Sequence, residues 1–105
     1  MKYTAADIAV LSFAYNGDVL KLDYEVSGGE HTHFFSEVQL MSFFSDESYC
    51  RAFSPSEREI LVPVPKVGVG NPEYAWVSLD YFVRQNLDRG MAEKIMLNHL
   101  NTVTA

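Results

Sequence analysis

The fold is decided by residues 9–24, which read AVLSFAYNGDVLKLDY. Asn16 and Gly17 stand between two runs in which apolar and polar residues alternate, and Asn-Gly is the pair that a two-residue type I′ hairpin turn favours. Such a turn puts the apolar members of both runs on one side of the hairpin. The pairs expected on this buried face are Phe13 with Leu20, Leu11 with Leu22 and Ala9 with Tyr24.

One competing interpretation concerns the start of this stretch. Thr4 to Asp7 has the form of a capping box, which would open a helix that runs through Ala14. A helix would discard the match between the two apolar runs. We therefore expect a β-hairpin with one face in the core and the other in water.

A second turn is expected at Ser27-Gly28-Gly29-Glu30, followed by a third strand over residues 31–40. The paired glycines leave its register open. A two- or four-residue loop would bury His31, His33 and Phe35. A three-residue loop with a glycine bulge would instead bury Phe34, Ser36, Val38 and Leu40.

The cost of burying an imidazole decides between these registers. An imidazole without a hydrogen-bond partner costs on the order of 1–3 kcal/mol to desolvate. We therefore expect the bulged turn and a three-stranded meander. Its solvated face would carry Asp23, Glu25, His31, His33 and Glu37.

The middle of the chain gives weaker signals. Residues 41–53 fit both a helix and a loop, and Ser54-Pro55-Ser56-Glu57 has the form of a short helix start. Pro63 and Pro65 favour an edge strand or a polyproline-like segment over residues 60–64.

The C-terminal third predicts two helices. After a loop at residues 66–72, residues 73–77 fit a return strand, or else a helix that Asn71 would cap. A helix is expected from about Ser78 to Arg89, with Gly90 at its C′ position, and a last helix over residues 91–101.

These elements predict one α+β domain over residues 1–105, an antiparallel meander of three or more strands packed on one face by C-terminal helices. The chain can bury about two-thirds of its unfolded surface, so it needs neither metal nor disulfide. No apolar run approaches the roughly 20 residues of a membrane span. Asp7 argues against a signal peptide, and the single cysteine, Cys50, agrees with a reducing compartment. We expect a cytoplasmic protein that binds no membrane.

The whole net charge of −6 lies in residues 18–47. They hold one base, Lys21, and seven acids, which are Asp18, Asp23, Glu25, Glu30, Glu37, Asp46 and Glu47. A localised acidic surface repels nucleic acid and attracts basic partners, so direct nucleic-acid binding is disfavoured. The alternative is that these charges only keep a half-exposed sheet soluble.

Fourteen aromatic residues are more than a core of this size needs. The surplus around Phe43, Phe44, Tyr49 and Phe53 lies beside Asp46 and Glu47 in the sequence. Aromatic anchors rimmed by acids suit a binder of basic protein surfaces. The cluster equally fits a role in the core or in a homodimer.

No catalytic or cofactor signature rises above background. His31 and His33 would lie about 7 Å apart on one side of a strand, a spacing known from metal sites, but a third strong ligand is missing. Gly68-Val69-Gly70 beside Lys66 lacks the full phosphate-loop pattern. Cys50 beside Arg51 reads as a buried cysteine rather than an activated thiol.

The function expected from these observations is protein binding without enzymatic activity or cofactor. The chain would be an inhibitor that docks on a basic surface of a nucleic-acid-handling protein, as phage anti-defence proteins and nuclease-immunity proteins do. The expected partner-binding residues are Asp18, Asp23, Glu25, Glu30, Glu37, Phe43, Phe44, Asp46, Glu47 and Tyr49. The alternatives are a small enzyme or ligand- or metal-binding domain that uses His31 and His33 with a carboxylate, and a self-associating structural subunit.

Overall fold

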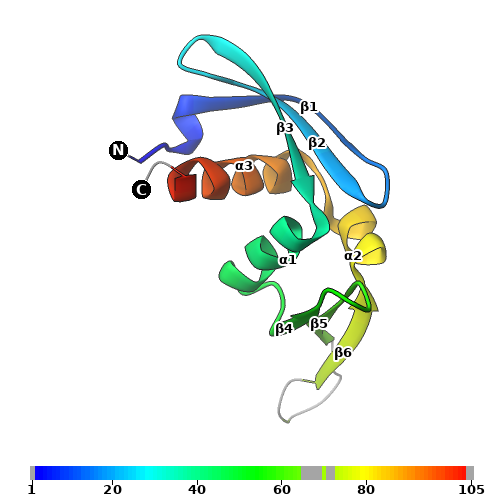
Figure 1. Ribbon diagram of the computed structural model, residues 1–105. Helices are drawn as coiled ribbons and strands as arrows, with labels where there is room; N and C mark the ends of the chain where they lie inside the picture. The colour runs from blue at the N-terminus through cyan, green and yellow to red at the C-terminus, as the bar shows by residue number, and fades with distance from the viewer. Residues whose placement is uncertain (1, 65–69, 71–72, 104–105) are drawn as a thin grey trace.

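The computed structural model describes residues 2–64, 70 and 73–103. Figure 1 shows its elements in chain order. A short 3₁₀ turn, η1, and nine regular elements follow one another as η1 Ala5–Asp7, β1 Ile8–Tyr15, β2 Val19–Val26, β3 Gly29–Ser36, α1 Glu37–Asp46, β4 Ala52–Ser54, β5 Glu59–Val64, β6 Glu73–Ser78, α2 Leu79–Asn86 and α3 Arg89–Val103.

The described strands form two antiparallel sheets, ordered β1-β2-β3 and β4-β5-β6. The helix α3 runs beneath the first sheet, and α1 lies between the first sheet and the second (Figure 1). This is the predicted α+β architecture, with a C-terminal helix packed on one face of a three-stranded meander. The prediction did not divide the strands into two sheets.

The β1–β2 hairpin is confirmed, but its register is wrong by two residues. Tyr15 pairs with Leu20 and Phe13 with Leu22, so four residues separate the innermost pair. The Asn16 side chain explains the longer loop, because its Oδ1 accepts hydrogen bonds from the amides of Asp18 and Val19, both at 2.9 Å. An even shift leaves each side chain on its predicted face.

A β-bulge then reverses the faces of the first half of β1. The register shifts between Val10 and Ser12, which leaves Leu11 unpaired. Ile8 and Val10 are therefore buried, whereas Leu11 is 44% exposed and Ala9 is exposed opposite Glu25. The predicted burial of Leu11 and Ala9 is wrong, because a bulge changes the alternation that the prediction assumed.

The capping box before β1 forms without starting a long helix. The Thr4 amide donates to Asp7 Oδ2 at 2.7 Å, and the Asp7 amide donates to the Thr4 carbonyl at 2.9 Å. These bonds close η1 only, and the chain is extended again from Ile8. The helix through Ala14 does not occur.

The second turn uses two residues, so the predicted bulged turn is wrong. Val26 pairs with Gly29 across Ser27 and Gly28, whose φ angles are 53° and 78°. Both angles suit a type I′ turn. The position of the turn was predicted but its length was wrong, because serine seldom adopts the positive φ that a two-residue turn needs at Ser27.

This turn reverses both faces of β3 relative to the prediction. His31, His33 and Phe35 lie on the side that faces the helices, and Phe34 is 60% exposed on the other side. His33 has aromatic neighbours in Phe35 and His99, at ring-centroid distances of 4.4 and 4.1 Å. These ring contacts pack the imidazole of His33 against other rings, although its Nε2 has no hydrogen-bond partner among the described residues.

The third strand ends at Ser36 instead of Leu40. Ser36 caps α1, since its Oγ accepts from the Gln39 amide at 3.3 Å and the Gln39 side chain accepts from the Ser36 amide at 2.9 Å. The undecided residues 41–53 thus contain most of α1 and the start of β4. Leu40 is buried as predicted, but Val38 is exposed.

The strand expected over residues 60–64 forms as β5, but the prediction that it lies at an edge is wrong, because β5 is the middle strand of the second sheet. Residues 55–58 form a turn between β4 and β5, not a helix start. Residues 59–61 of β5 lie between β4 and β6. Pro63 lies past the end of β4, so its missing N–H costs no hydrogen bond to β4. The return strand is confirmed as β6, so the alternative of a helix over residues 73–77 is wrong. Most of the predicted loop, including Lys66, Gly68 and Val69, lies outside the described residues.

Both C-terminal helices are confirmed with different bounds. Ser78 caps α2 through a bond from the Tyr81 amide at 3.0 Å. Asp88 Oδ1 accepts from the Met91 amide at 2.7 Å, so α3 begins at Arg89. Gly90 therefore lies in the first turn of α3 instead of ending α2.

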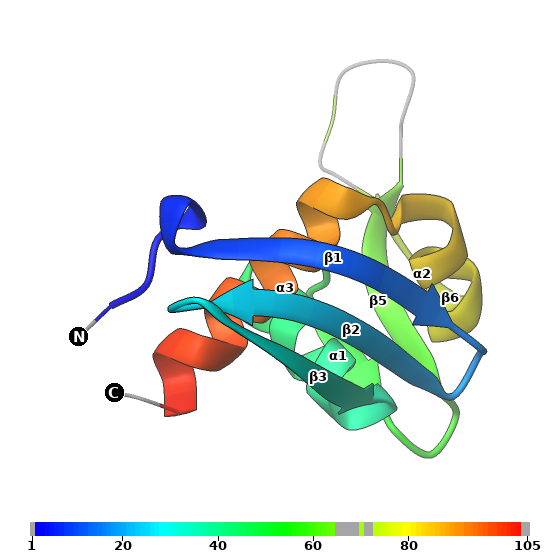
Figure 2. The same ribbon diagram turned by 90° about the horizontal axis from the view of Figure 1, so that it is seen from above.

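One hydrophobic core joins both sheets and all three α-helices. Both sheets and each of the described α-helices contribute fully or nearly fully buried side chains, among them Leu22 of β2, Phe44 of α1, Ile60 of β5, Val83 of α2 and Met96 of α3. The first sheet gives only one of its faces to this core. Figure 2 shows its other face, with no described helix or strand lying over it.

Candidate partner-binding site

The outer face of the first sheet is the candidate site. We use this name for the exposed or half-exposed side chains that point away from the helices, which are Leu11, Ser12, Lys21, Asp23, Glu25, Glu30, Thr32 and Phe34. They come from all three strands. A shallow hollow of about 440 Å³ lies among some of them, and Leu11, Asp23 and Glu30 help to line it.

Asp23 lies at the centre of the outer face and is held by both neighbouring strands. Its Oδ2 accepts a hydrogen bond from Ser12 Oγ at 2.6 Å, and its Oδ1 accepts one from Thr32 Oγ1 at 2.5 Å. The bond from Ser12, followed by that from Thr32, lowers the pKa of the Asp23 carboxyl. The centre of this face is therefore a fixed carboxylate that stays charged at neutral pH.

Apolar and acidic side chains flank this carboxylate. Leu11 and Phe34 are two of the large apolar residues that the described chain exposes. Glu25 and Glu30 face each other next to the β2–β3 turn, and Lys21 faces Phe34. With three acids against one base, the outer face has a net negative charge, and its exposed aromatic ring lies at the end opposite the two glutamates.

Two predicted partner-binding acids instead form ion pairs with Arg58 at the surface of the molecule. Arg58 Nη2 lies 2.8 Å from Asp18 Oδ1, and Arg58 Nε lies 2.7 Å from Glu37 Oε2. Arg58 also donates to the Gly17 carbonyl at 3.0 Å. The hydrogen bond and the charge of Glu37, followed by Asp18, raise the pKa of Arg58. Asp18 and Glu37 thus join the first hairpin and α1 to the β4–β5 turn.

The remaining two acids lie on the helical side of the molecule. Asp46 lines a cleft between α1 and α3, and Glu47 lines another hollow together with Lys2 and Lys94. The expectation that all seven acids share one surface is wrong. The reason is the cap at Ser36, because α1 turns the chain away from the sheet.

The predicted aromatic contact patch forms part of the core. Phe43 and Phe44 are buried, and Tyr49 is half-buried against both rings, at centroid distances of 6.1 and 6.0 Å. Phe44 also contacts Phe82 edge-to-face at 4.9 Å. Of the two interpretations that the sequence left open, the core role fits these residues.

The histidines do not assemble the metal site that the alternative required. The ring centroids of His31 and Tyr24 lie 5.5 Å apart, whereas the ring of His33 lies against that of His99 on α3, tilted by 37°. The described residues contain no group of three or more His, Cys, Asp or Glu side chains placed to hold a metal ion. Burial lowers the pKa of His33, and burial followed by the nearby charge of His33 lowers that of His99. The buried Nε2 of His33 has no hydrogen-bond partner within the described part of the chain.

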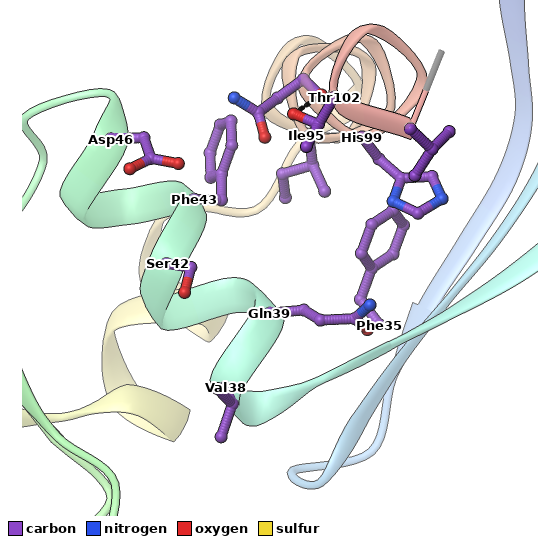
Figure 3. Close-up of a pocket in the computed structure, with 11 residues that line it drawn as sticks. Phe35, Val38, Gln39, Ser42, Phe43, Asp46, Ile95, His99 and Thr102 are labelled. Carbon is purple, nitrogen blue, oxygen red and sulfur yellow. Dashed lines mark hydrogen bonds between the residues drawn. The ribbon is translucent and has the colours of Figure 1, made fainter. Parts of the chain in front are cut away.

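The cleft between α1 and α3 has an apolar wall and two ionisable groups. Its volume is about 290 Å³, and Phe35, Phe43 and Ile95 line it. Figure 3 shows Asp46 and His99 at opposite ends of this cleft, so they do not form an acid–base pair. Burial raises the pKa of the Cys50 thiol, which argues against an activated nucleophile there.

Sequence reasoning found three acids of the outer face and missed its apolar residues. Phe34 and Leu11 were assigned to the core, and Thr32 was not considered. For Phe34, the signal that could have corrected the register is the capping box Ser36-x-x-Gln39, which ends the strand and removes Val38 and Leu40 from its alternation. No local signal marks the bulge at Leu11.

Comparisons of the chain with protein-family models, with curated proteins and with solved structures gave no match. No helix in the described part of the chain combines the length and the apolar character that crossing a bilayer requires. The candidate site therefore stands on its own geometry.

Proposed function

We propose that the protein is a protein-binding module that docks on a basic surface of its partner through the outer face of the first sheet. One observation carries this proposal. The outer face has a fixed carboxylate at its centre and exposed apolar side chains beside it, and no described helix or strand covers it.

Phe34 supplies affinity in this proposal. Large aromatic side chains are common anchors at the centre of protein interfaces, and burying one contributes about 1.5–3 kcal/mol. Phe34 is 60% exposed, so most of its ring is still available for burial.

The acids supply orientation and association rate. Complementary charges steer partners together, and a carboxylate that two hydroxyls already hold loses little side-chain entropy on binding. Asp23, Glu25 and Glu30 fill this role, whereas Asp18 and Glu37 are occupied by Arg58.

The specific form that we propose is an inhibitor that covers a cationic groove on a nucleic-acid-handling protein, of the phage anti-defence or nuclease-immunity kind. Grooves that bind nucleic acid are basic, and a small acidic face with an aromatic anchor complements them. The charge is confined to one face, which suits filling a groove better than imitating a duplex.

Affinity capture from the cells in which the chain occurs tests the proposal. Wild type is compared with Phe34→Ser and with Tyr81→Ser, which changes an equally exposed aromatic residue on α2 (59% against 60%). We expect Phe34→Ser to weaken capture of the partner at least about tenfold. Tyr81→Ser should capture as wild type does.

Salt dependence provides a second arm of the same experiment. Capture by wild type should fall between low and moderate salt, and Asp23→Asn with Glu25→Gln and Glu30→Gln should reduce this dependence. Capture that is insensitive to Phe34→Ser, or lost in Tyr81→Ser instead, would overturn the proposal.

A further inference from the structure

The two edges of the first sheet are protected unequally. On the β1 edge, the bulge at Leu11 interrupts the strand, and the Arg89 side chain donates to the Val10 carbonyl. The β3 edge has neither device, because Gly29 to Ser36 pairs with β2 in one unbroken register. Natural sheets usually protect such an edge, since a regular edge strand can pair with another chain.

The turn at Ser27 and Gly28 determines which backbone groups point outward. In a two-residue hairpin the flanking pair, here Val26 and Gly29, exchanges both backbone hydrogen bonds, and the next pair exchanges none. The N–H and C=O groups of Glu30, Thr32 and Phe34 therefore point away from β2. All three side chains are exposed.

We propose that two copies of this chain pair antiparallel along β3, about a twofold axis that places Thr32 opposite Thr32 of the second copy. This register also places Glu30 opposite Phe34 of the second copy. It uses all the outward groups of the three residues, which gives about six hydrogen bonds and a continuous sheet of six strands. An axis at Glu30 would place equal charges opposite each other, and an axis at Phe34 would leave Thr32 opposite Ser36, at the start of α1.

Charge complementarity on the outer face favours a second copy as the occupant of this edge. Within one copy, Glu25 faces Glu30 and Lys21 faces Phe34. Across the dimer, each row then reads Glu25, Glu30, followed by Phe34 and Lys21 of the second copy. The lysine stem can lie along the phenylalanine ring while its ammonium group approaches Glu30. Both symmetric rows thus pair acids with a base, and both exposed rings become partly covered.

The proposed dimer does not rest on the proposed function. Apart from the part of each Phe34 ring that the second copy covers, the outer face of both copies stays open above the shared sheet, so a partner can still dock there. Loss of partner capture on Phe34→Ser and loss of the dimer are separate measurements.

Engineered cysteines test the pairing and its register together. Opposite residues of a hydrogen-bonded pair have Cα atoms about 5.5 Å apart, which a disulfide spans. Thr32→Cys should therefore form a disulfide-linked dimer on mild oxidation. Glu30→Cys alone and Phe34→Cys alone should not, whereas a mixture of the two should. Native Cys50 is buried and should not form an intermolecular disulfide. Ala14→Cys, at an exposed position of β1, controls for disulfides that form by random collision.

Sedimentation velocity on the unmodified chain provides the second readout. We expect the measured mass to rise from that of a monomer to that of a dimer as the concentration increases. Glu30→Lys puts a positive charge in the same row as Lys21 of the second copy and should weaken the dimer about tenfold. Adding Lys21→Glu to Glu30→Lys should restore it. A monomer at every concentration, or Thr32→Cys that cross-links no faster than Ala14→Cys, would overturn the inference.

Discussion

The two faces of the first sheet are built from the same three strands and have opposite roles. Phe34 and Phe35 are neighbours in the sequence, yet Phe34 is 60% exposed and Phe35 is 3% exposed. The inner face fills the core with Leu20, Leu22 and Phe35, and the outer face carries Asp23 between two hydroxyls. The difference teaches that the number of residues in a turn, even or odd, decides which side chains of the next strand face the core. Residue type alone does not decide it.

The largest expected effect separates the two phenylalanines. Phe35→Ala should lower the free energy of unfolding by about 3–5 kcal/mol, because it leaves a cavity in the core. Phe34→Ala should change it by less than about 0.5 kcal/mol, as expected for a surface substitution. Urea denaturation of both variants measures the difference. Equal losses would mean that the register of β3 is wrong.

A smaller effect tests the turn that determines this parity. Gly28 has a φ of 78°, so Gly28→Ala should lower the free energy of unfolding by about 1 kcal/mol. Gly90 lies in the first turn of α3 without a positive φ, so Gly90→Ala should raise it by about 0.5–1 kcal/mol. Thermal or urea unfolding of this matched pair gives both values, and a Gly28→Ala variant as stable as wild type would contradict the two-residue turn.

The smallest effect that we expect is a pH dependence of the free energy of unfolding, which arises from two histidines on the inner side of the first sheet. Burial lowers the pKa of His33 and of His99 below the usual 6.5. The unfolded chain therefore takes up protons on both rings at a higher pH than the native state does, so stability falls as the pH drops below about 6.5.

The measurement is the urea midpoint of unfolding at about pH 7.5 and about pH 5. A variant with His33→Gln and His99→Gln should lose less stability over this interval than wild type. An equal loss in both proteins would place the acid sensitivity elsewhere in the molecule.

Elements with strong local signals were predictable from the sequence. Asn16-Gly17 located the first hairpin, and the apolar spacing of residues 79–87 located α2. It was harder to predict which side chains of β1 and β3 face the core, because in each strand this depends on one backbone feature that the local sequence hardly indicates. These features are the bulge at Leu11 in β1 and the positive φ of Ser27 before β3.

The candidate site was predictable only in part for the same reason. Asp23, Glu25 and Glu30 were identified because they lie in residues 18–47, where the net negative charge of the chain is concentrated. Asp18 and Glu37 were not separable from them, since their partner Arg58 lies 40 and 21 residues away in the chain. Phe34 was missed because its face depends on the parity of the turn.

The central claim is that the partner contacts the outer face, and photo-cross-linking tests it most directly. A photoreactive phenylalanine analogue is placed at position 34 in one protein and at position 81 in another, and adducts are identified by mass spectrometry after irradiation in the cells of origin. We predict a covalent adduct with a basic protein from position 34 and none from position 81. An adduct of that protein from position 81, with none from position 34, would contradict the claim.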